Sequence, residues 1–224
     1  MVLYTVEVVN NSDADDKIYT VFSGKTGVLG GGNNDSSAKA VVWSRIGPLG
    51  IGQSDSFAFD NSYYAFSGSI RNGQVYGREN KVATIASNMN EGSIFVLNHT
   101  SKFEPYAADN EVRAPSKGQF KILTSSTLTT ANNLIGVSRG LDNGNDKIVP
   151  LPVTVVPLKP SVTYTFTTTK AVYVKAFDYA VGTTQAVPDD KTQDAVKVEF
   201  TGSFTRAVVT EDTNGKFDVA FYLV

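Results

Sequence analysis

Short runs in which apolar and polar residues alternate dominate this chain and limit it to one fold class. The first run, Leu3–Asn10, places Tyr4, Val6 and Val8 on one face of an extended strand. Similar runs follow, rich in Val, Thr, Phe and Tyr, and clusters of Gly, Asn, Asp and Ser separate them. No stretch keeps the 3.6-residue period of an amphipathic helix. The pattern therefore predicts an all-β protein.

The number of strand runs, about twelve, requires that a sheet closes on itself or that two sheets pack together. We expect an antiparallel two-sheet β-sandwich that forms a single domain over residues 1–224. Prolines cluster at residues 150–160, and proline lacks the N–H that a sheet ladder needs. That segment is expected to be an edge strand or a link, so a division of the chain there is the alternative.

Two Asn-Gly pairs predict tight hairpins. Asn72-Gly73 lies between two strand runs, and Asn214-Gly215 joins the last two runs. Asn-Gly suits the type I′ turn because both residues tolerate a positive φ. The first strand run and residues 17–22 are separated by a turn rich in Asn, Asp and Ser, so they are expected to form a hairpin as well.

Three further segments carry specific predictions. Residues 23–38 include a triple glycine and are expected to form a long mobile loop. Residues 189–195 are the best candidate for a short helical turn, because acidic residues open it. In the final run, Phe217, Val219, Phe221 and Leu223 alternate with smaller or polar residues, which predicts that all four side chains enter the core.

The charge pattern argues against two classes of partner. The 20 basic and 22 acidic residues give a net charge of −2, and the basic residues are scattered singly. Nucleic-acid binding and polybasic membrane contacts both need clustered Lys and Arg. No apolar run approaches the roughly 20 residues that span a bilayer, and no secretory signal opens the chain. We therefore expect a cytoplasmic protein without nucleic-acid or membrane partners.

Few residues are available for catalysis or metal binding. The chain has no cysteine and one histidine, which removes thiolate chemistry, disulfides and cysteine zinc sites. No Gly-x-Ser-x-Gly motif accompanies His99. Residues 142–146 and 212–218 are similar to calcium loops but lack the closing glutamate. We predict no catalytic residue, no cofactor and no metal.

Four residues are candidates for ligand binding: Trp43, Arg45, Tyr63 and Tyr76. Alternation places Trp43 and Arg45 on the same face of one strand. Tyr63 and its neighbour Tyr64 face opposite sides, so one of the two points away from the core. Exposed aromatic rings beside a guanidinium suit stacking on a sugar or planar ligand. The alternative interpretation is that Trp43 is a core residue.

Three functions fit these observations. The first is a non-catalytic protein that binds a carbohydrate or small ligand, or that self-associates as a homo-oligomer. The second is a cofactor-independent enzyme of the cyclase or isomerase type, which would use Tyr, Asp and Arg in an apolar pocket. The third is a structural protein that assembles through exposed strand edges. A deep cavity lined by several carboxylates or tyrosines favours the enzyme, and a shallow aromatic patch favours binding.

Segments 4–12 and 19–23 resemble the opening of a group of uncharacterised fungal proteins. Segments 41–44 and 64–68 are similar to the same group, although Ser67 stands where the group has a cysteine. The resemblance covers about the first third of the chain. It implies a cytosolic β-sandwich without a signal peptide, and it implies no activity.

Overall fold

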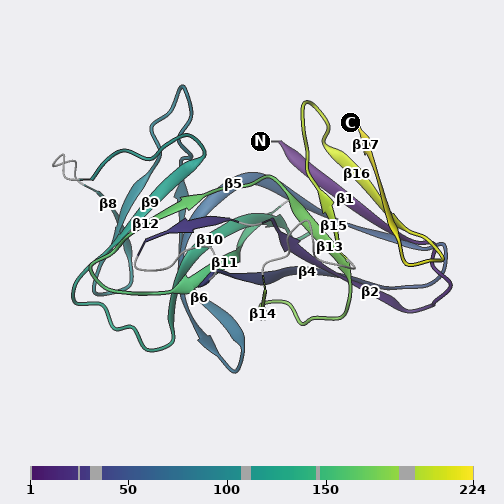
Figure 1. Ribbon diagram of the computed structural model, residues 1–224, viewed down its shortest axis with the longest axis horizontal. Helices are drawn as coiled ribbons and strands as arrows, with labels where there is room; N and C mark the ends of the chain where they lie inside the picture. Colours follow the sequence, from purple (N-terminus) through teal and green to yellow (C-terminus); the bar gives the residue numbers. More distant parts are fainter. Residues whose placement is uncertain are drawn as a thin grey trace.

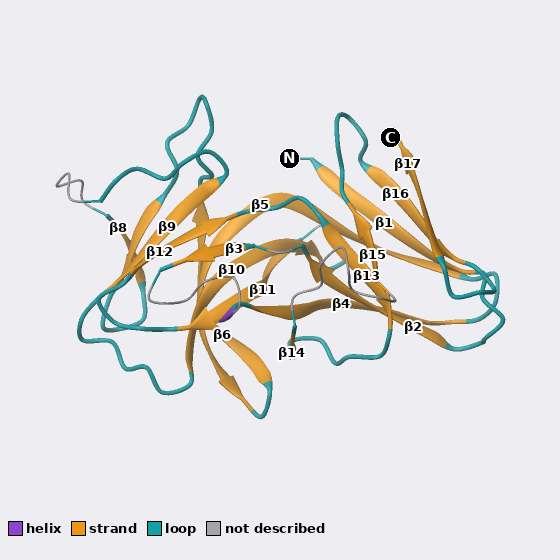
Figure 2. Cartoon of the chain, viewed as in Figure 1, coloured by secondary structure: helices purple, strands orange, loops and turns teal. Residues whose placement is uncertain are grey.

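The computed structural model describes residues 2–24, 26–30, 37–106, 112–144, 147–186 and 195–223. Strands make up most of this part of the chain (Figure 2), and apart from a 3₁₀ turn at Ser37 it contains no helix. The prediction of an all-β protein is therefore confirmed.

The described residues form seventeen strands in two sheets (Figure 1). The larger sheet has twelve strands, in the order β15-β13-β2-β4-β11-β10-β5-β1-β16-β17, with β14 beside β4 and β6 beside β5. The smaller sheet has five strands, in the order β3-β12-β9-β7-β8. The bounds are β1 Leu3–Asn10, β2 Lys17–Ser23, β3 Gly27–Leu29, β4 Lys39–Leu49, β5 Ser54–Arg71, β6 Gln74–Ala83, β7 Ile94–Leu97, β8 Phe103–Pro105, β9 Gln119–Thr124, β10 Asn133–Asp142, β11 Ile148–Pro157, β12 Thr163–Thr167, β13 Val172–Ala176, β14 Thr184–Gln185, β15 Ala195–Val198, β16 Arg206–Glu211 and β17 Phe217–Tyr222.

The larger sheet curls until its two end strands, β15 and β17, contact each other, so that this end of the molecule is barrel-like. The five-stranded sheet lies at the other end (Figure 1). The prediction of a two-sheet antiparallel sandwich is therefore only partly right. Twist accumulates from strand to strand, and a twelve-stranded sheet with this twist curls toward closure instead of staying open. Two pairings, β1–β16 and β7–β9, are parallel.

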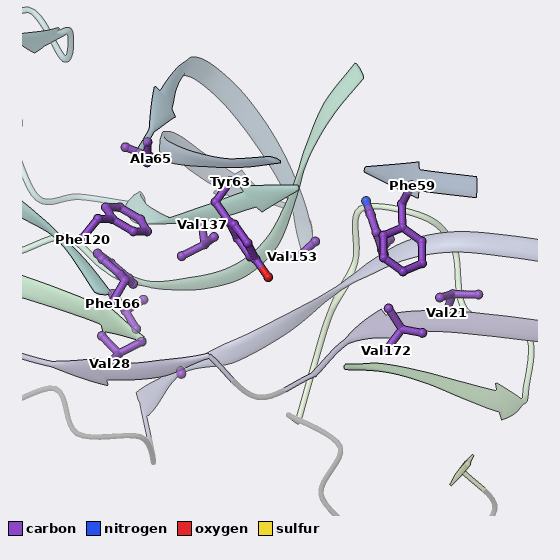
Figure 3. Packing of buried hydrophobic residues seen from close by; sticks show 14 of the residues in the cluster. Val21, Val28, Phe59, Tyr63, Ala65, Phe120, Val137, Val153, Phe166 and Val172 are labelled. Atoms are coloured by element: carbon purple, nitrogen blue, oxygen red, sulfur yellow. The ribbon is translucent and has the colours of Figure 1, made fainter. Parts of the chain in front are cut away.

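One buried cluster runs through both ends of the molecule. Figure 3 shows Tyr63 between two groups of side chains, with Phe120 and Phe166 on one side and Phe59 and Val172 on the other. Phe120 and Phe166 belong to the smaller sheet, and the other three belong to the larger one. The barrel-like end and the end that holds the five-stranded sheet therefore share a continuous apolar interior.

The predicted hairpin between β1 and β2 is wrong. β1 pairs with β5 and β16, whereas β2 pairs with β4 and β13. Asn10 redirects the chain, because its Nδ2 donates to the carbonyl oxygens of Ala14 (2.8 Å) and Leu49 (2.9 Å). Its Oδ1 accepts the Ser12 amide at 3.0 Å. These bonds build a wide turn, so β2 leaves β1 instead of folding back on it.

Both predicted Asn-Gly hairpins form, and the last strand ends earlier than predicted. Asn72 (φ 50°) and Gly73 (φ 78°) both have the positive φ of a type I′ turn, so the β5–β6 hairpin is confirmed. The last two strands also pair as predicted. In β17, Phe217, Val219 and Phe221 pack against the core, but Leu223 follows the strand and is 69% exposed. The prediction for Leu223 is therefore wrong, because the strand ends before it.

The structure tests the predictions for residues 23–38 and for the proline cluster, and only the end of the predicted helical turn at residues 189–195. Residues 23–38 contain β3, which pairs with β12 and buries Val28, so a continuous loop is wrong; residues 25 and 31–36 lie outside the described residues. Of the predicted helical turn, residues 189–194 also lie outside them, and Ala195 begins β15. The prediction of an edge strand or link at residues 150–160 is wrong, because β11 is an inner strand between β4 and β10. It pairs with β4 at Thr154 and Val155, away from Pro150 and Pro152, which lack the N–H for that ladder.

Candidate functional site

A groove with a volume of about 660 Å³ lies where the two sheets meet. Residues 61–63 of β5 and residues between 82 and 87, at the end of β6, form one side of it. The turn at Lys117-Gly118, before β9, and residues from Thr168 to Lys170, after β12, form the other side. We call this hollow the inter-sheet groove.

Main-chain hydrogen bonds fix the walls of the groove. The Gly118 amide donates to the Ala86 carbonyl oxygen (2.8 Å), and the Ala86 amide donates to the Gln119 carbonyl oxygen (3.0 Å). The Thr168 amide donates to the Gly118 carbonyl oxygen at 2.9 Å. Gly118 has a φ of 81°, which a glycine adopts without strain. Segments far apart in the sequence are thus bonded to one another before any ligand arrives.

Tyr63 forms part of the groove wall. Its side chain is 6% exposed, and its hydroxyl donates to the Thr169 carbonyl oxygen at 2.7 Å. Burial raises the pKa of the phenol, so it stays protonated near neutral pH. Tyr63 is therefore a fixed wall of the groove that ties β5 to the link between β12 and β13.

Tyr63 also contacts a fully buried arginine. The guanidinium carbon of Arg139, in β10, lies 5.0 Å from the ring centroid of Trp43, 4.6 Å from that of Phe59 and 5.5 Å from that of Tyr63. We call these four residues the Arg139 cage. Arg139 Nη1 donates to the Ala171 carbonyl oxygen at 3.4 Å. The cage thus holds the far end of the same β12–β13 link that Tyr63 holds through Thr169.

Several buried polar atoms in and beside the Arg139 cage lack hydrogen-bond partners among the described residues. Within the part of the chain that the structure describes, Arg139 Nε and Nη2, Trp43 Nε1 and Oδ2 of buried Asp60 have no hydrogen-bond partner. Burial lowers the pKa of Arg139, and the nearby carboxylate of Asp60 opposes that shift. Gly140 lets Asp60 approach, because a Cβ there would lie 2.3 Å from Asp60 Oδ1. The cage is a packing and positioning centre beneath the groove.

The groove itself is positively charged. Lys117 and Lys170 line it and are exposed, and neither ammonium group has an ion-pair or hydrogen-bond partner within the described part of the chain. Among the described residues, no Asp or Glu belongs to the lining. Val82, Ile85 and two alanines supply an apolar side. The groove therefore combines two free cations with apolar surface.

Trp43 and Arg45 lie on opposite faces of β4, so the prediction that they share a face is wrong. Val21 pairs with Ser44 and Phe22 pairs with Val42, which leaves Trp43 as the extra residue of a β-bulge. A bulge breaks the alternation of side chains. Trp43 is consequently fully buried in the core, whereas Arg45 points outward and pairs with Asp178, with 2.7 Å between Nε and Oδ1.

The structure brings two of the four predicted ligand residues together. Trp43 and Tyr63 meet in the Arg139 cage, and Tyr63 alone lines the groove. Tyr76 is 48% exposed on β6, and its hydroxyl donates to Gln74 Oε1 at 3.2 Å. No ring contact or hydrogen bond joins Tyr76 or Arg45 to the other candidates. A ligand-binding role for these residues stays a prediction.

No protein-family model matches this chain, and no curated protein or solved structure matches it either. The resemblance to uncharacterised fungal proteins accordingly stays a prediction. Within the described ranges, no three His, Cys, Asp or Glu side chains are grouped to hold a metal ion. The same ranges contain no helix with the length and apolar character needed to cross a bilayer.

Sequence reasoning missed Arg139, Lys117 and Lys170. Arg139 could have been found, because it is the one charged residue within the apolar run from Leu134 to Leu141. The two lysines carry no such pattern. They lie in connections that are separated by 53 positions (117 to 170), and only the packing of the two sheets brings them to one groove.

Proposed function

We propose that this protein binds a small organic ligand, a carbohydrate or another small molecule, in the inter-sheet groove and does not transform it. The observation that carries the proposal is a groove of about 660 Å³ whose walls are already bonded to one another. Small-molecule sites typically measure roughly 300–1,000 Å³ and are largely preformed. Preformed walls reduce the ordering cost that a ligand meets on binding.

The lining of the groove supports binding over acid–base chemistry. General acid–base catalysis uses titratable groups whose pKa values lie near the working pH and whose side chains converge on the substrate. Burial raises the pKa of Tyr63, and its hydroxyl is already engaged with the Thr169 carbonyl oxygen. His99 is exposed in the turn after β7 and does not line the groove.

A substitution that covers the groove tests the proposal. Val82 lines the groove and is 67% exposed, so Val82→Trp adds an indole at the opening without disturbing the core. The wild-type protein is screened by thermal shift against neutral sugars, acidic sugars, amino acids, organic acids and planar aromatics. Hits are then measured by calorimetry. We expect Val82→Trp to weaken binding about tenfold or more, as loss of shape complementarity in a small pocket does.

The matched control is Lys81→Trp, on the adjacent exposed residue of β6, whose side chain faces the opposite side of the strand. This control should bind like the wild type. Ligands that bind Val82→Trp as tightly as the wild type contradict the proposal. If binding is lost instead in Tyr76→Ala or Arg45→Gln, the exposed residues predicted from the sequence form the site.

A further inference from the structure

We propose that the ligand of the inter-sheet groove is an organic anion with an apolar body, recognised by Lys117 and Lys170. This inference rests on the proposed function and adds the chemical class of the ligand. Its first support is charge: within the described part of the chain, two ammonium groups line the groove, no carboxylate lines it, and neither ammonium has a partner. Charge-assisted hydrogen bonds to an anion would satisfy both cations.

The second support is the way in which the two lysines are held. Lys170 lies between Thr169, whose carbonyl oxygen accepts the Tyr63 hydroxyl, and Ala171, whose carbonyl oxygen accepts Arg139 Nη1. Lys117 precedes Gly118, which is bonded to Ala86 and Thr168. The backbone of each lysine is therefore fixed at the groove while its side chain stays free to reach a ligand. Such support from surrounding bonds is what a binding site requires.

The third support is the difference in sign between the net charge of the chain and the charge of the groove lining. The chain carries a net charge of −2, yet the charged residues that line its groove, among those that the structure describes, are both lysines. The carboxylate of Asp60, next to the lining residue Asn61, is fully buried and so does not reach the groove. The apolar side chains of Val82 and Ile85 lie on the same lining and match the body of the ligand. A molecule with one acidic group and an apolar frame fits both features.

Two fluorescent probes that differ by one acidic group test the inference. 8-Anilinonaphthalene-1-sulfonate and N-phenyl-1-naphthylamine share an aromatic frame, and only the first carries a sulfonate. Both are titrated into the folded full chain at low salt. We expect the sulfonate to bind more tightly. The double variant Lys117→Gln/Lys170→Gln should weaken sulfonate binding roughly fivefold, the combined effect of two exposed charge pairs, and leave the neutral probe unchanged.

The controls separate the inference from the function on which it rests. Lys39→Gln/Lys102→Gln removes two exposed lysines away from the groove and should change neither affinity. If it weakens the sulfonate as much as the groove variant does, or if the groove variant weakens neither probe, the anionic class is overturned. If Val82→Trp still blocks both probes in that case, the groove remains the binding site. If Val82→Trp blocks neither probe, the proposed function fails as well.

Discussion

Arg139 places a full positive charge inside an apolar core without an ion pair within the described residues. Its stabilisation comes from the faces of the Trp43, Phe59 and Tyr63 rings and from weak bonds to Ser23 and Ala171. Cation–π contacts gain strength when they are desolvated. A buried charge that relies on aromatic faces depends on the exact packing around it, so this residue should be sensitive to truncation.

Arg139→Ala is expected to lower the free energy of unfolding by about 3–5 kcal/mol, because it leaves a cavity and removes the cation packed between three aromatic rings. Urea unfolding measures the loss. The emission of Trp43, the only tryptophan in the chain, should shift because the guanidinium lies 5.0 Å from its ring. Arg45→Ala is the control, since its exposed ion pair with Asp178 should contribute little. Equal losses for both variants would contradict a special role for the cage.

Tyr19 makes the free energy of unfolding decrease with rising pH in the alkaline range. Burial raises the pKa of its phenol, and the hydrogen bond from its hydroxyl to Glu211 Oε2 (2.7 Å) raises it further. The unfolded chain releases this proton near pH 10, whereas the folded chain keeps it. The stabilisation is thus complete below about pH 10 and declines as the pH rises above that value.

Melting temperatures measured from pH 8 to pH 11 should therefore fall less steeply for Tyr19→Phe than for the wild type. Tyr222→Phe, at an exposed position, should keep the wild-type slope. Tyr63 and Tyr64 also have raised pKa values, so part of the alkaline decline will remain in Tyr19→Phe. The same slope for Tyr19→Phe and the wild type would rule out Tyr19 as a contributor.

At the scale of elements, the β12–β13 link is the part of the chain that connects the core to the groove. Tyr63 and Arg139 bond to its carbonyl oxygens, and Lys170 lies between those two anchors. Thr168 joins it to the Lys117-Gly118 turn through two bonds to the Gly118 carbonyl oxygen, from its amide (2.9 Å) and its Oγ1 (3.1 Å). The positions of both groove lysines therefore depend on strand connections and not on strands.

The final strand, β17, gives an element-scale prediction. Phe221 packs on Phe200 and Phe204, with ring centroids 5.7 and 6.0 Å away, whereas Leu223 is 69% exposed. Phe221→Ala should lower the free energy of unfolding by about 1–3 kcal/mol, less than the value for a fully buried phenylalanine. Leu223→Ala should leave the urea midpoint unchanged. If Leu223→Ala lowers the free energy of unfolding more than Phe221→Ala does, the strand continues into the core.

At the scale of the whole molecule, one apolar interior connects the barrel-like end with the end that holds the five-stranded sheet. Residues of both sheets belong to the same buried cluster, in which Tyr63 lies between the two groups (Figure 3). A continuous core predicts that the two ends unfold together. Self-association through strand edges stays a prediction, since no feature of the described strands identifies a partner.

Unfolding measurements test whether the chain behaves as one unit or divides near residues 150–160. Phe166 lies in the five-stranded sheet, whereas the fluorescence of Trp43 reports the unfolding of the larger sheet. The test uses the variant Phe166→Ala. We expect the variant to lower the urea midpoint seen by Trp43 fluorescence, and circular dichroism should give the same midpoint. If Phe166→Ala leaves the urea midpoint of the Trp43 fluorescence unchanged, the two ends unfold as independent units.

The sequence by itself determined the strands and the turns that have local causes. Period-two alternation predicted β1 with its bounds, Leu3–Asn10, and Asn72-Gly73 predicted the β5–β6 turn, because both depend on neighbouring residues alone. Tyr63 was also among the predicted ligand residues, and it lines the groove.

Only the tertiary structure decided which strands pair, where the bulge at Trp43 falls and which loops meet at the groove. β1 pairs with β16, about 200 positions away in the chain. Alternation specifies which face of a strand is apolar, but it does not specify a partner, because many strands present the same face. Lys117 and Lys170 became neighbours of one groove for the same reason: packing between two sheets is non-local, and no spacing in the sequence records it.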